Sequence, residues 1–176
     1  MKLIEAMKKV KDLTRKADDL RKKISQHCAD MDFETPLYGN EAEQTQTIRG
    51  WIQAHHDVVK LISDLRIAIQ KTNLVTPVVI TLTEDLTVTK TIAEWIHRRR
   101  DLSKMELSVW QSLGDRGLKE GQLPATQPGG QPRDCKIRRY YDPKERDAKI
   151  ELFASEASTI DATLEVTNAI TDLIQE

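Results

Sequence analysis

The stretch LIEAMKKVKDLTRKADDLRKKI (residues 3–24) places apolar residues at alternating intervals of three and four. The residues in this register are Leu3, Ala6, Val10, Leu13, Ala17, Leu20 and Ile24. Such spacing is the a/d seam of a coiled coil, so the stretch predicts a long helix that packs along another helix. We expect this helix to end near residues 27–30, ahead of Pro36, Gly39 and Asn40.

A second helix is predicted from Asn40 to about Thr72, because Asn40 and Glu43 have the spacing of a capping box. Its apolar stripe is broad. The predicted central row is Ile48, Ile52, His55, Val59, Ile62, Arg66 and Ile69, and the row beside it is Trp51, Val58 and Leu65. A stripe of this width predicts contact with two neighbours.

Two more helices are predicted toward the C-terminus. The third begins near Thr81–Glu84 and carries the stripe Val88, Ile92, Trp95, Arg99, Leu102, Val109 and Leu113, flanked by Ile96 and Met105. The fourth begins at Asp142 as N-cap with Pro143 at N1, and Glu145 completes a capping box. Its stripe is Ile150, Phe153, Ala157, Ile160, Leu164, Thr167, Thr171 and Ile174.

Two short segments between these helices have the composition of strands. Residues 75–83 (VTPVVITLT) are β-branched, and residues 135–141 (CKIRRYY) alternate. We expect them to pair as a small hairpin-like tab between helices 2/3 and 3/4. Residues 114–134 contain five of the seven glycines and three of the six prolines, which predicts an exposed, mobile loop. The predicted fold is mainly α: one domain over residues 1–176, a bundle of four long coiled-coil-like helices with this tab.

Composition narrows the class of protein. Charged residues make up 31% of the 176 residues and aromatic residues only 5%, as in proteins with long exposed helices. The net charge of −1 gives no strong signal for nucleic acid. The sequence contains no apolar run of about 18 residues and no signal peptide, so we expect no transmembrane segment and a location in the cytoplasm or in a virion. Cys28 and Cys135 are expected to be free thiols, with a disulfide between them left open.

The two ends of the chain carry opposite charge. Residues 1–27 have nine Lys or Arg against four Asp or Glu, a net of +5. Residues 143–176 have three Lys or Arg against eight Asp or Glu, a net of −5. This complementarity predicts that the terminal helices pack together, within one chain or between two copies.

Motifs for catalysis are missing from the sequence. It holds no Walker A, GxGxxG, GxSxG or HExxH signature, so we expect no enzyme, no catalytic residue and no cofactor. The adjacent pair His55-His56 lacks the i, i+4 spacing of helical metal ligands, and nothing near His27-Cys28 completes a site, so no metal is expected.

Two basic clusters form a candidate interface or basic patch. Their residues are Arg98, Arg99, Arg100, Arg138, Arg139 and Tyr140. Aromatic residues beside cations are typical of surfaces that bind single-stranded nucleic acid. The interpretation we prefer is an arginine row that is either solvated or forms an interface, with Arg99 paired to an acidic residue on a facing helix.

The phrase T-N-x-x-T occurs twice, and its residues form a candidate polar network at helix ends: Thr72, Asn73, Thr76, Thr167, Asn168 and Thr171. The first copy is expected to stop the second helix, because Asn tolerates the left-handed conformation that ends helices. The second copy is expected to lie within the fourth helix or to kink it. Parallel second and fourth helices would bring the two Asn side chains together.

Several of these pieces together resemble the septicolysin-like family of small, mostly uncharacterised bacterial helical proteins. The resemblance rests on MKLIEA at the start, on IAIQKTN, on TLTEDL followed by IHRRRDL, and on LEVTNAITDLI at the end. The sequence departs from the family pattern at Gln70, where Asn is usual, and at Ala169-Ile170, where an aromatic often follows the Asn. The resemblance implies a helical fold and, through the family name, a cytolysin. It implies no catalytic residues.

Taken together, these patterns predict a non-catalytic, self-associating helical protein with a structural or assembly role, such as a subunit of a larger particle like a phage virion. The expected partner is a second copy or another assembly protein. The first alternative is a membrane-active cytolysin, as the septicolysin-like resemblance implies. The second alternative is a nucleic-acid-binding or regulatory partner that uses the basic clusters.

Overall fold

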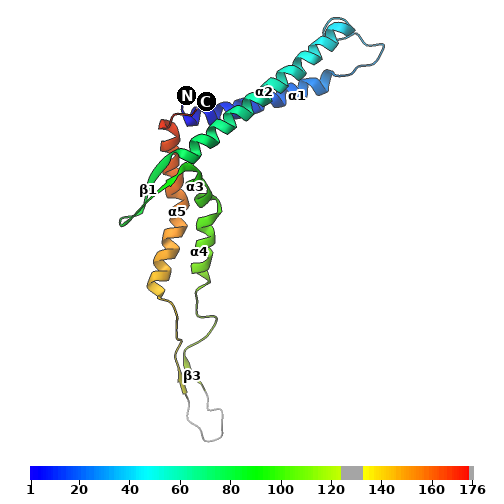
Figure 1. Ribbon diagram of the computed structural model, residues 1–176. Coiled ribbons are helices and arrows are strands. Elements are labelled where there is room, and N and C mark those ends of the chain that lie inside the picture. Colours follow the sequence, from blue (N-terminus) through cyan, green and yellow to red (C-terminus); the bar gives the residue numbers. More distant parts are fainter. Residues whose placement is uncertain (124–132, 175–176) are drawn as a thin grey trace. The chain divides into compact units, whose positions relative to one another are not determined.

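The computed structural model describes residues 1–123 and 133–174 of the chain, and it is mainly helical with two short hairpins (Figure 1). Residues 124–132 of the predicted mobile loop 114–134 lie outside the described residues. The helices are α1 (Leu3–His27), α2 (Glu41–Val75), α3 (Ile92–His97), the π-helical turn η1 (Arg98–Leu102), α4 (Ser103–Ser112) and α5 (Pro143–Ile170). The strands are β1 (Pro77–Thr83), β2 (Leu86–Thr91), β3 (Gly121–Leu123) and β4 (Arg133–Cys135).

The chain divides into two compact units. The first unit comprises Met1–Pro77, Thr91–Ala93 and the segment from Leu164 to the C-terminus. The second unit comprises Val78–Lys90 and Glu94–Thr163. Helix α5 supplies residues to both units. The single domain predicted over residues 1–176 stays a prediction.

Helices α1 and α2 of the first unit pack side by side as an antiparallel hairpin (Figure 1). Every residue of the predicted α1 seam is buried or half-buried, and nearly all other α1 residues are exposed. Leu3 and Ala6 are fully buried at the start of the seam. The predicted long helix packed along a second helix is therefore confirmed.

The buried row of α2 differs from the predicted central row. Ile52 and Val59 are 52% and 46% exposed, and Arg66 is also exposed. The less exposed row follows a regular 3-4 spacing through Ile48, Trp51, His55, Val58, Ile62, Leu65, Ile69 and Thr72. The predicted central row was wrong: the row predicted beside it, through Trp51, Val58 and Leu65, is the one that is buried. Both rows have helical periodicity, and α1 covers one of them.

Both predicted N-cap residues sit at helix starts, and at Asn40 the full predicted capping box is present. Asn40 Oδ1 accepts hydrogen bonds from the backbone N–H groups of Ala42 and Glu43, each at 3.0 Å, and Glu43 Oε2 accepts from Asn40 N at 3.1 Å. At the start of α5, Asp142 Oδ1 accepts from Lys144 N at 2.9 Å, and Pro143 is the first helical residue. These side chains satisfy N–H groups that a helix start would otherwise leave unpaired.

The predicted tab between residues 75–83 and 135–141 is wrong. Strand β1 pairs with β2, which follows it after the two-residue connection Glu84-Asp85, and the pair is therefore antiparallel. Strand β3 pairs with β4 within the predicted loop, with Gln122 opposite Asp134. Residues 136–141 form no strand. Pairing with the nearest strand closes a much shorter loop and costs less entropy.

The third helix starts later than predicted, at Ile92, because LTVTKT (residues 86–91) forms β2. The core of the second unit lies beside this hairpin. It contains Val78, Ile80, Trp95, Phe153 and Ile160, all buried. The indole Nε1 of Trp95 donates to Val78 O at 3.0 Å, so the largest core side chain also has its polar group paired.

The chain termini meet in the first unit. Leu3 N donates to Thr171 O and Leu173 N donates to Met1 O, both at 2.9 Å, as in a short antiparallel bridge. The Lys2 ammonium lies 2.9 Å from Asp172 Oδ1 and donates to Ile170 O at the end of α5. This bond lowers the pKa of Asp172 below its usual value. The packing predicted between the two terminal helices is limited, in the first unit, to this short junction of their ends, and the helix that packs along α1 is α2.

Candidate functional site

Arg98 is the centre of an ion-pair cluster in the second unit. Its guanidinium binds Glu156 of α5 in a bidentate manner, with Nε–Oε1 and Nη2–Oε2 distances of 2.6 and 3.0 Å. A third bond joins Nη1 to Glu106 Oε1 at 2.5 Å. The guanidinium also lies 5.4 Å from the centre of the Phe153 ring. The hydrogen bonds to Glu156 raise the pKa of Arg98 above its usual value, so the arginine is always charged.

The local backbone around Arg98 is unusual. Residues Arg98–Leu102 form the π-helical turn η1, and Ser103 N donates to Arg98 O across five residues. Turns of this kind inside a helix are frequent at functional sites. The Ser103 side chain is buried, and its Oγ has no hydrogen-bond partner among the described residues. Arg98 and Arg99, both within this turn, bind carboxylates of α5.

The expected ion pair of Arg99 with a facing helix is present, because Arg99 Nη1 binds Asp161 Oδ1 of α5. Both side chains are about half exposed, at 43% and 56%. Exposed pairs stabilise a fold little, so Arg99 contributes less than Arg98. Arg100 is exposed and forms no ion pair recorded among residues 1–123 and 133–174. The three arginines predicted as one row thus have three different environments.

The second basic cluster lines a pocket of about 380 Å³ in the second unit. Arg139 binds Asp115 in a bidentate manner at 2.7 and 2.6 Å. This pairing holds the pKa of Asp115 below its usual value. Arg138 and Tyr140 are exposed, Tyr140 to 90%. Arg116 lines the same pocket, whereas Arg98–Arg100 do not. The two predicted basic clusters are therefore separate.

The two T-N-x-x-T copies occupy equivalent places, both in the first unit. In each copy the last Thr directly follows a helix, α2 in one case and α5 in the other. Its N–H donates to the carbonyl of the first Thr, Thr76 to Thr72 at 3.1 Å and Thr171 to Thr167 at 2.9 Å. Residues 167–170 of the second copy lie inside α5, as predicted, but the helix ends at Ile170, so the predicted continuation through Thr171 to Ile174 is wrong.

Each copy also receives the start of another helix. Thr76 O accepts from the N–H of Ile92, the first residue of α3, and Thr171 O accepts from the N–H of Leu3, the first residue of α1. The buried Thr72 hydroxyl donates to Ala68 O at 2.8 Å and accepts from Ile174 N at 3.0 Å. T-N-x-x-T is therefore a helix-to-helix junction that is used twice.

The asparagines of the two junctions share one more property. Asn73 Oδ1 and Asn168 Oδ1 are both buried atoms with no hydrogen-bond partner among the described residues. Among the described residues other than glycine, positive φ occurs at Arg116 alone. Neither Asn therefore has the left-handed backbone that was expected to stop the second helix. Contact between the two Asn side chains stays a prediction.

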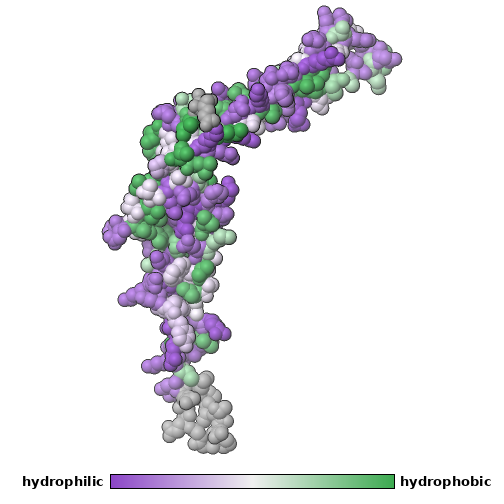
Figure 2. Space-filling view, viewed as in Figure 1, coloured by the Kyte–Doolittle hydropathy of each residue, from purple (hydrophilic) through white to green (hydrophobic). Residues whose placement is uncertain are grey.

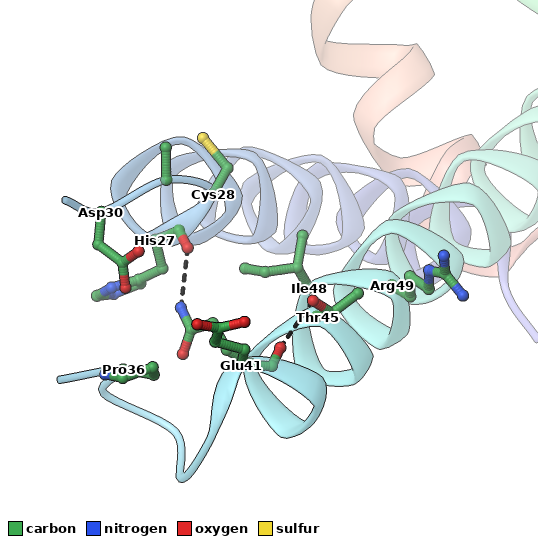
Figure 3. A pocket seen from close by; sticks show the side chains of 10 residues that line it. His27, Cys28, Asp30, Pro36, Glu41, Thr45, Ile48 and Arg49 are labelled. Carbon is green, nitrogen blue, oxygen red and sulfur yellow. Dashed lines mark hydrogen bonds between the residues drawn. The ribbon is translucent and has the colours of Figure 1, made fainter. Parts of the chain in front are cut away.

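A pocket of about 420 Å³ opens where α1 ends and α2 begins (Figure 3). Gln44 crosses this region: its Nε2 donates to His27 O at 2.9 Å, and its Oε1 accepts from Tyr38 N at 3.1 Å. The rings of His27, Tyr38 and Trp51 pack with centroids 5.3–5.8 Å apart. Figure 3 shows Ile48 pointing toward α1 and the Cys28 sulfur pointing away from the gap. These contacts hold the connection between α1 and α2 in place, so we interpret the pocket as part of this structural turn.

Neither cysteine nor histidine builds a reactive centre in the described part of the chain. Cys28 and Cys135 are free thiols. No group of three or more His, Cys, Asp or Glu side chains suited to a metal ion occurs among the described residues. His55 is half-buried and His56 is exposed, as expected for neighbours on one helix. No helix within the described ranges is long and apolar enough to cross a membrane.

Comparison with known proteins gives a likeness of fold. No family model matches the chain, and no curated protein matches its sequence. A crystal structure of a functionally unknown conserved protein from Corynebacterium diphtheriae is similar over 99% of this chain and 99% of that chain, with a TM-score of 0.55 and 19% sequence identity. At this identity the likeness concerns the fold alone. Membership of the septicolysin-like family stays a prediction from the sequence.

Sequence reasoning missed the partners that complete these clusters. Glu156, Asp115 and Gln44 each fix a cluster through bidentate or double contacts. Glu156 offered one usable signal: it is next to Ala157 of the predicted apolar stripe, where a buried charge needs a partner.

Proposed function

We propose that this protein is a non-catalytic, self-associating helical assembly protein in which the α1–α2 hairpins of two copies pack together. The observation that carries the proposal is the surplus of apolar side chains on α2. Its buried row already packs toward α1, yet large apolar residues also occupy both sides of that row and are 40–61% exposed: Ile52, Val59, Leu61 and Val75. A helix that is apolar on this many sides favours more than one helical neighbour.

A second copy of the hairpin fits this surface best, since it offers the same apolar flank in return. Two hairpins related by a two-fold axis would complete a four-helix bundle, which is the architecture predicted for a single chain. On the visible face of α1 and α2, Figure 2 shows green hydrophobic atoms among the purple hydrophilic ones. Ile4 and Met7 of α1, 42% and 47% exposed, extend the surface that such a dimer would bury.

The energetic contribution of the flank is moderate. Ile52 and Val59 are about half exposed, so covering each stabilises by roughly 1 kcal/mol, or about 4 kcal/mol for the four side chains of two copies. Association itself costs at least about 4 kcal/mol, so the other exposed apolar residues, Leu61, Val75, Ile4 and Met7, must also be covered. At roughly 1 kcal/mol each, their eight side chains in two copies add about 8 kcal/mol, which corresponds to association at micromolar concentrations.

The test is the mass in solution of the wild type and two matched variants, measured by light scattering during size-exclusion chromatography. I52K/V59K places two charges seven residues apart on the proposed interface. Q46K/Q53K adds the same charges with the same spacing at exposed positions away from it. We expect the wild type and Q46K/Q53K to form dimers or larger species and I52K/V59K to be monomeric. A wild-type protein that is strictly monomeric at micromolar concentration refutes the proposal.

A second exposed apolar row supports assembly beyond a dimer. Leu102, Met105 and Val109 follow helical spacing near and along α4 and are 43%, 62% and 62% exposed. Two separate self-association surfaces on one chain produce larger particles, as a virion subunit would require. M105E/V109E should reduce species larger than a dimer, whereas S108E/Q111E, also exposed on α4, should not. If M105E/V109E and S108E/Q111E change the size of the particles equally, the proposal of a second self-association surface on α4 is refuted.

The membrane-active alternative places lipid against the same exposed apolar residues. It predicts release of dye from vesicles on addition of the protein. Release that disappears in I52K/V59K would favour the cytolysin interpretation, and the absence of release at any lipid composition would favour assembly.

A further inference from the structure

The pocket around Arg139, here called the Arg/Tyr pocket, combines features of a ligand site. It lies between two segments of the second unit, residues 112–118 and 137–141. Its volume of about 380 Å³ is within the range of small-molecule sites. Its lining residues are Ser112, Leu113, Gly114, Asp115, Arg116, Leu118, Ile137, Arg138, Arg139, Tyr140 and Tyr141.

Polar contacts support the two segments of the pocket. The bidentate Arg139–Asp115 pair joins them directly. Residues beside them add two contacts: Arg146 Nη1 of α5 donates to Leu113 O at 3.3 Å, and Glu120 Oε1 accepts from Ile137 N at 3.1 Å. The Arg146 guanidinium also lies 5.7 Å from the centre of the Tyr141 ring. These contacts order the walls in part before a ligand binds, which lowers the entropic cost of binding.

The charges that line the pocket do not cancel. Asp115 neutralises Arg139, and it is the acidic residue of the lining. Arg116 and Arg138 are exposed, and the structure records no ion pair for either within its described ranges. Two guanidinium groups facing one open pocket attract an anion and can bind phosphate through paired N–H groups.

Tyr140 supplies a different kind of contact. Its ring is 90% exposed beside these arginines, and an aromatic ring left so open is available for stacking. Bases of nucleotides stack on tyrosine rings, and arginines bind their phosphates. Anion recognition and ring stacking thus occur at one pocket.

We propose that the Arg/Tyr pocket binds a nucleotide unit, with Arg116 and Arg138 on the phosphate and Tyr140 stacked on the base. The inference is independent of self-association through α2. The unit can come from a free nucleotide or from single-stranded nucleic acid, and both sources present the same chemistry.

The test is fluorescence anisotropy with a fluorescein-labelled oligothymidylate at several salt concentrations. We expect saturable binding that Tyr140→Ala weakens by about tenfold, since base–aromatic stacking has this magnitude. Arg138→Gln should weaken binding and lower the slope of log affinity against log salt by about one. The matched control is Lys136→Gln, which removes one exposed charge two residues away and outside the pocket.

Competition distinguishes the sources. Displacement of the oligothymidylate by AMP identifies a free nucleotide as sufficient, whereas binding of the oligothymidylate without displacement by AMP identifies single-stranded nucleic acid. Inorganic phosphate alone should compete more weakly than AMP, because it lacks the stacking ring. The proposal is overturned if neither probe binds at low salt, or if Lys136→Gln weakens binding as much as Arg138→Gln and Tyr140→Ala do.

Discussion

Replacement of Arg98 by Met should strongly destabilise the second unit. Glu156 is only 1% exposed and depends on Arg98 for two of its hydrogen bonds. Arg98→Met leaves that carboxylate buried without its cation. Loss of one partner of a buried pair costs about 3–5 kcal/mol, so we expect the free energy of unfolding to fall by that amount.

The double variant R98M/E156M makes this prediction specific. Removal of both charges takes away the desolvation penalty along with the attraction, and apolar pairs in such places are often as stable as the ion pair. We expect R98M/E156M to regain most of the stability lost by R98M. Glu106 is 49% exposed and tolerates the loss of its partner in water.

Urea unfolding measures these differences, with the emission of buried Trp95 as the probe in a background where Trp51 and Trp110 are Phe. The raised pKa of Arg98 means that its contribution is complete at any pH below the usual arginine pKa. A loss of less than about 1 kcal/mol in R98M, or a double variant no more stable than R98M, would refute the reasoning.

Further predictions concern contacts of single residues. Thr72→Val should cost about 1–2 kcal/mol and speed amide exchange at Ile174, whose N–H loses its acceptor, while Thr72→Ser should restore protection. Gln44→Ala should cost about 1 kcal/mol and raise amide exchange at the loop between α1 and α2, measured by hydrogen–deuterium exchange. Asp115 has a pKa below its ordinary 3.8, so its bond to Arg139 is present above that pH and is lost as the pH falls through the folded pKa. Carboxyl NMR shifts should give this pKa, and Arg139→Gln should return it toward 3.8.

Helices were predictable wherever one face of a helix meets a single neighbour. The α1 seam has a narrow stripe, and capping residues mark the starts of α2 and α5, so local patterns contain the information. The α2 register was not predictable in the same way. Ile52 and Val59 are as apolar as Val58 and Leu65, and nothing in the α2 sequence says which row faces α1.

The strands and ion-pair partners depend on information that a single sequence does not hold. Val88 and Ile92 have helical spacing, although β2 contains the first and α3 begins with the second. Arg98 and Arg99 were recognisable as a cluster, but their acceptors lie 58 and 62 residues away. Only the fold brings Glu156 and Asp161 to them.

The two copies of T-N-x-x-T have the same structural role, although the apolar spacing around the second copy predicted a different one. Each copy ends a helix with the same Thr-to-Thr backbone bond, and each final Thr offers its carbonyl to the first N–H of another helix. A helix start has N–H groups without partners, and a helix end has carbonyls without partners, so joining the two satisfies both. The second copy was expected to continue its helix because Thr171 and Ile174 keep the 3-4 spacing. The helix nevertheless ends at Ile170: Thr171 closes its last turn and receives the start of α1, and the Ile174 N–H donates to the Thr72 hydroxyl of the other copy.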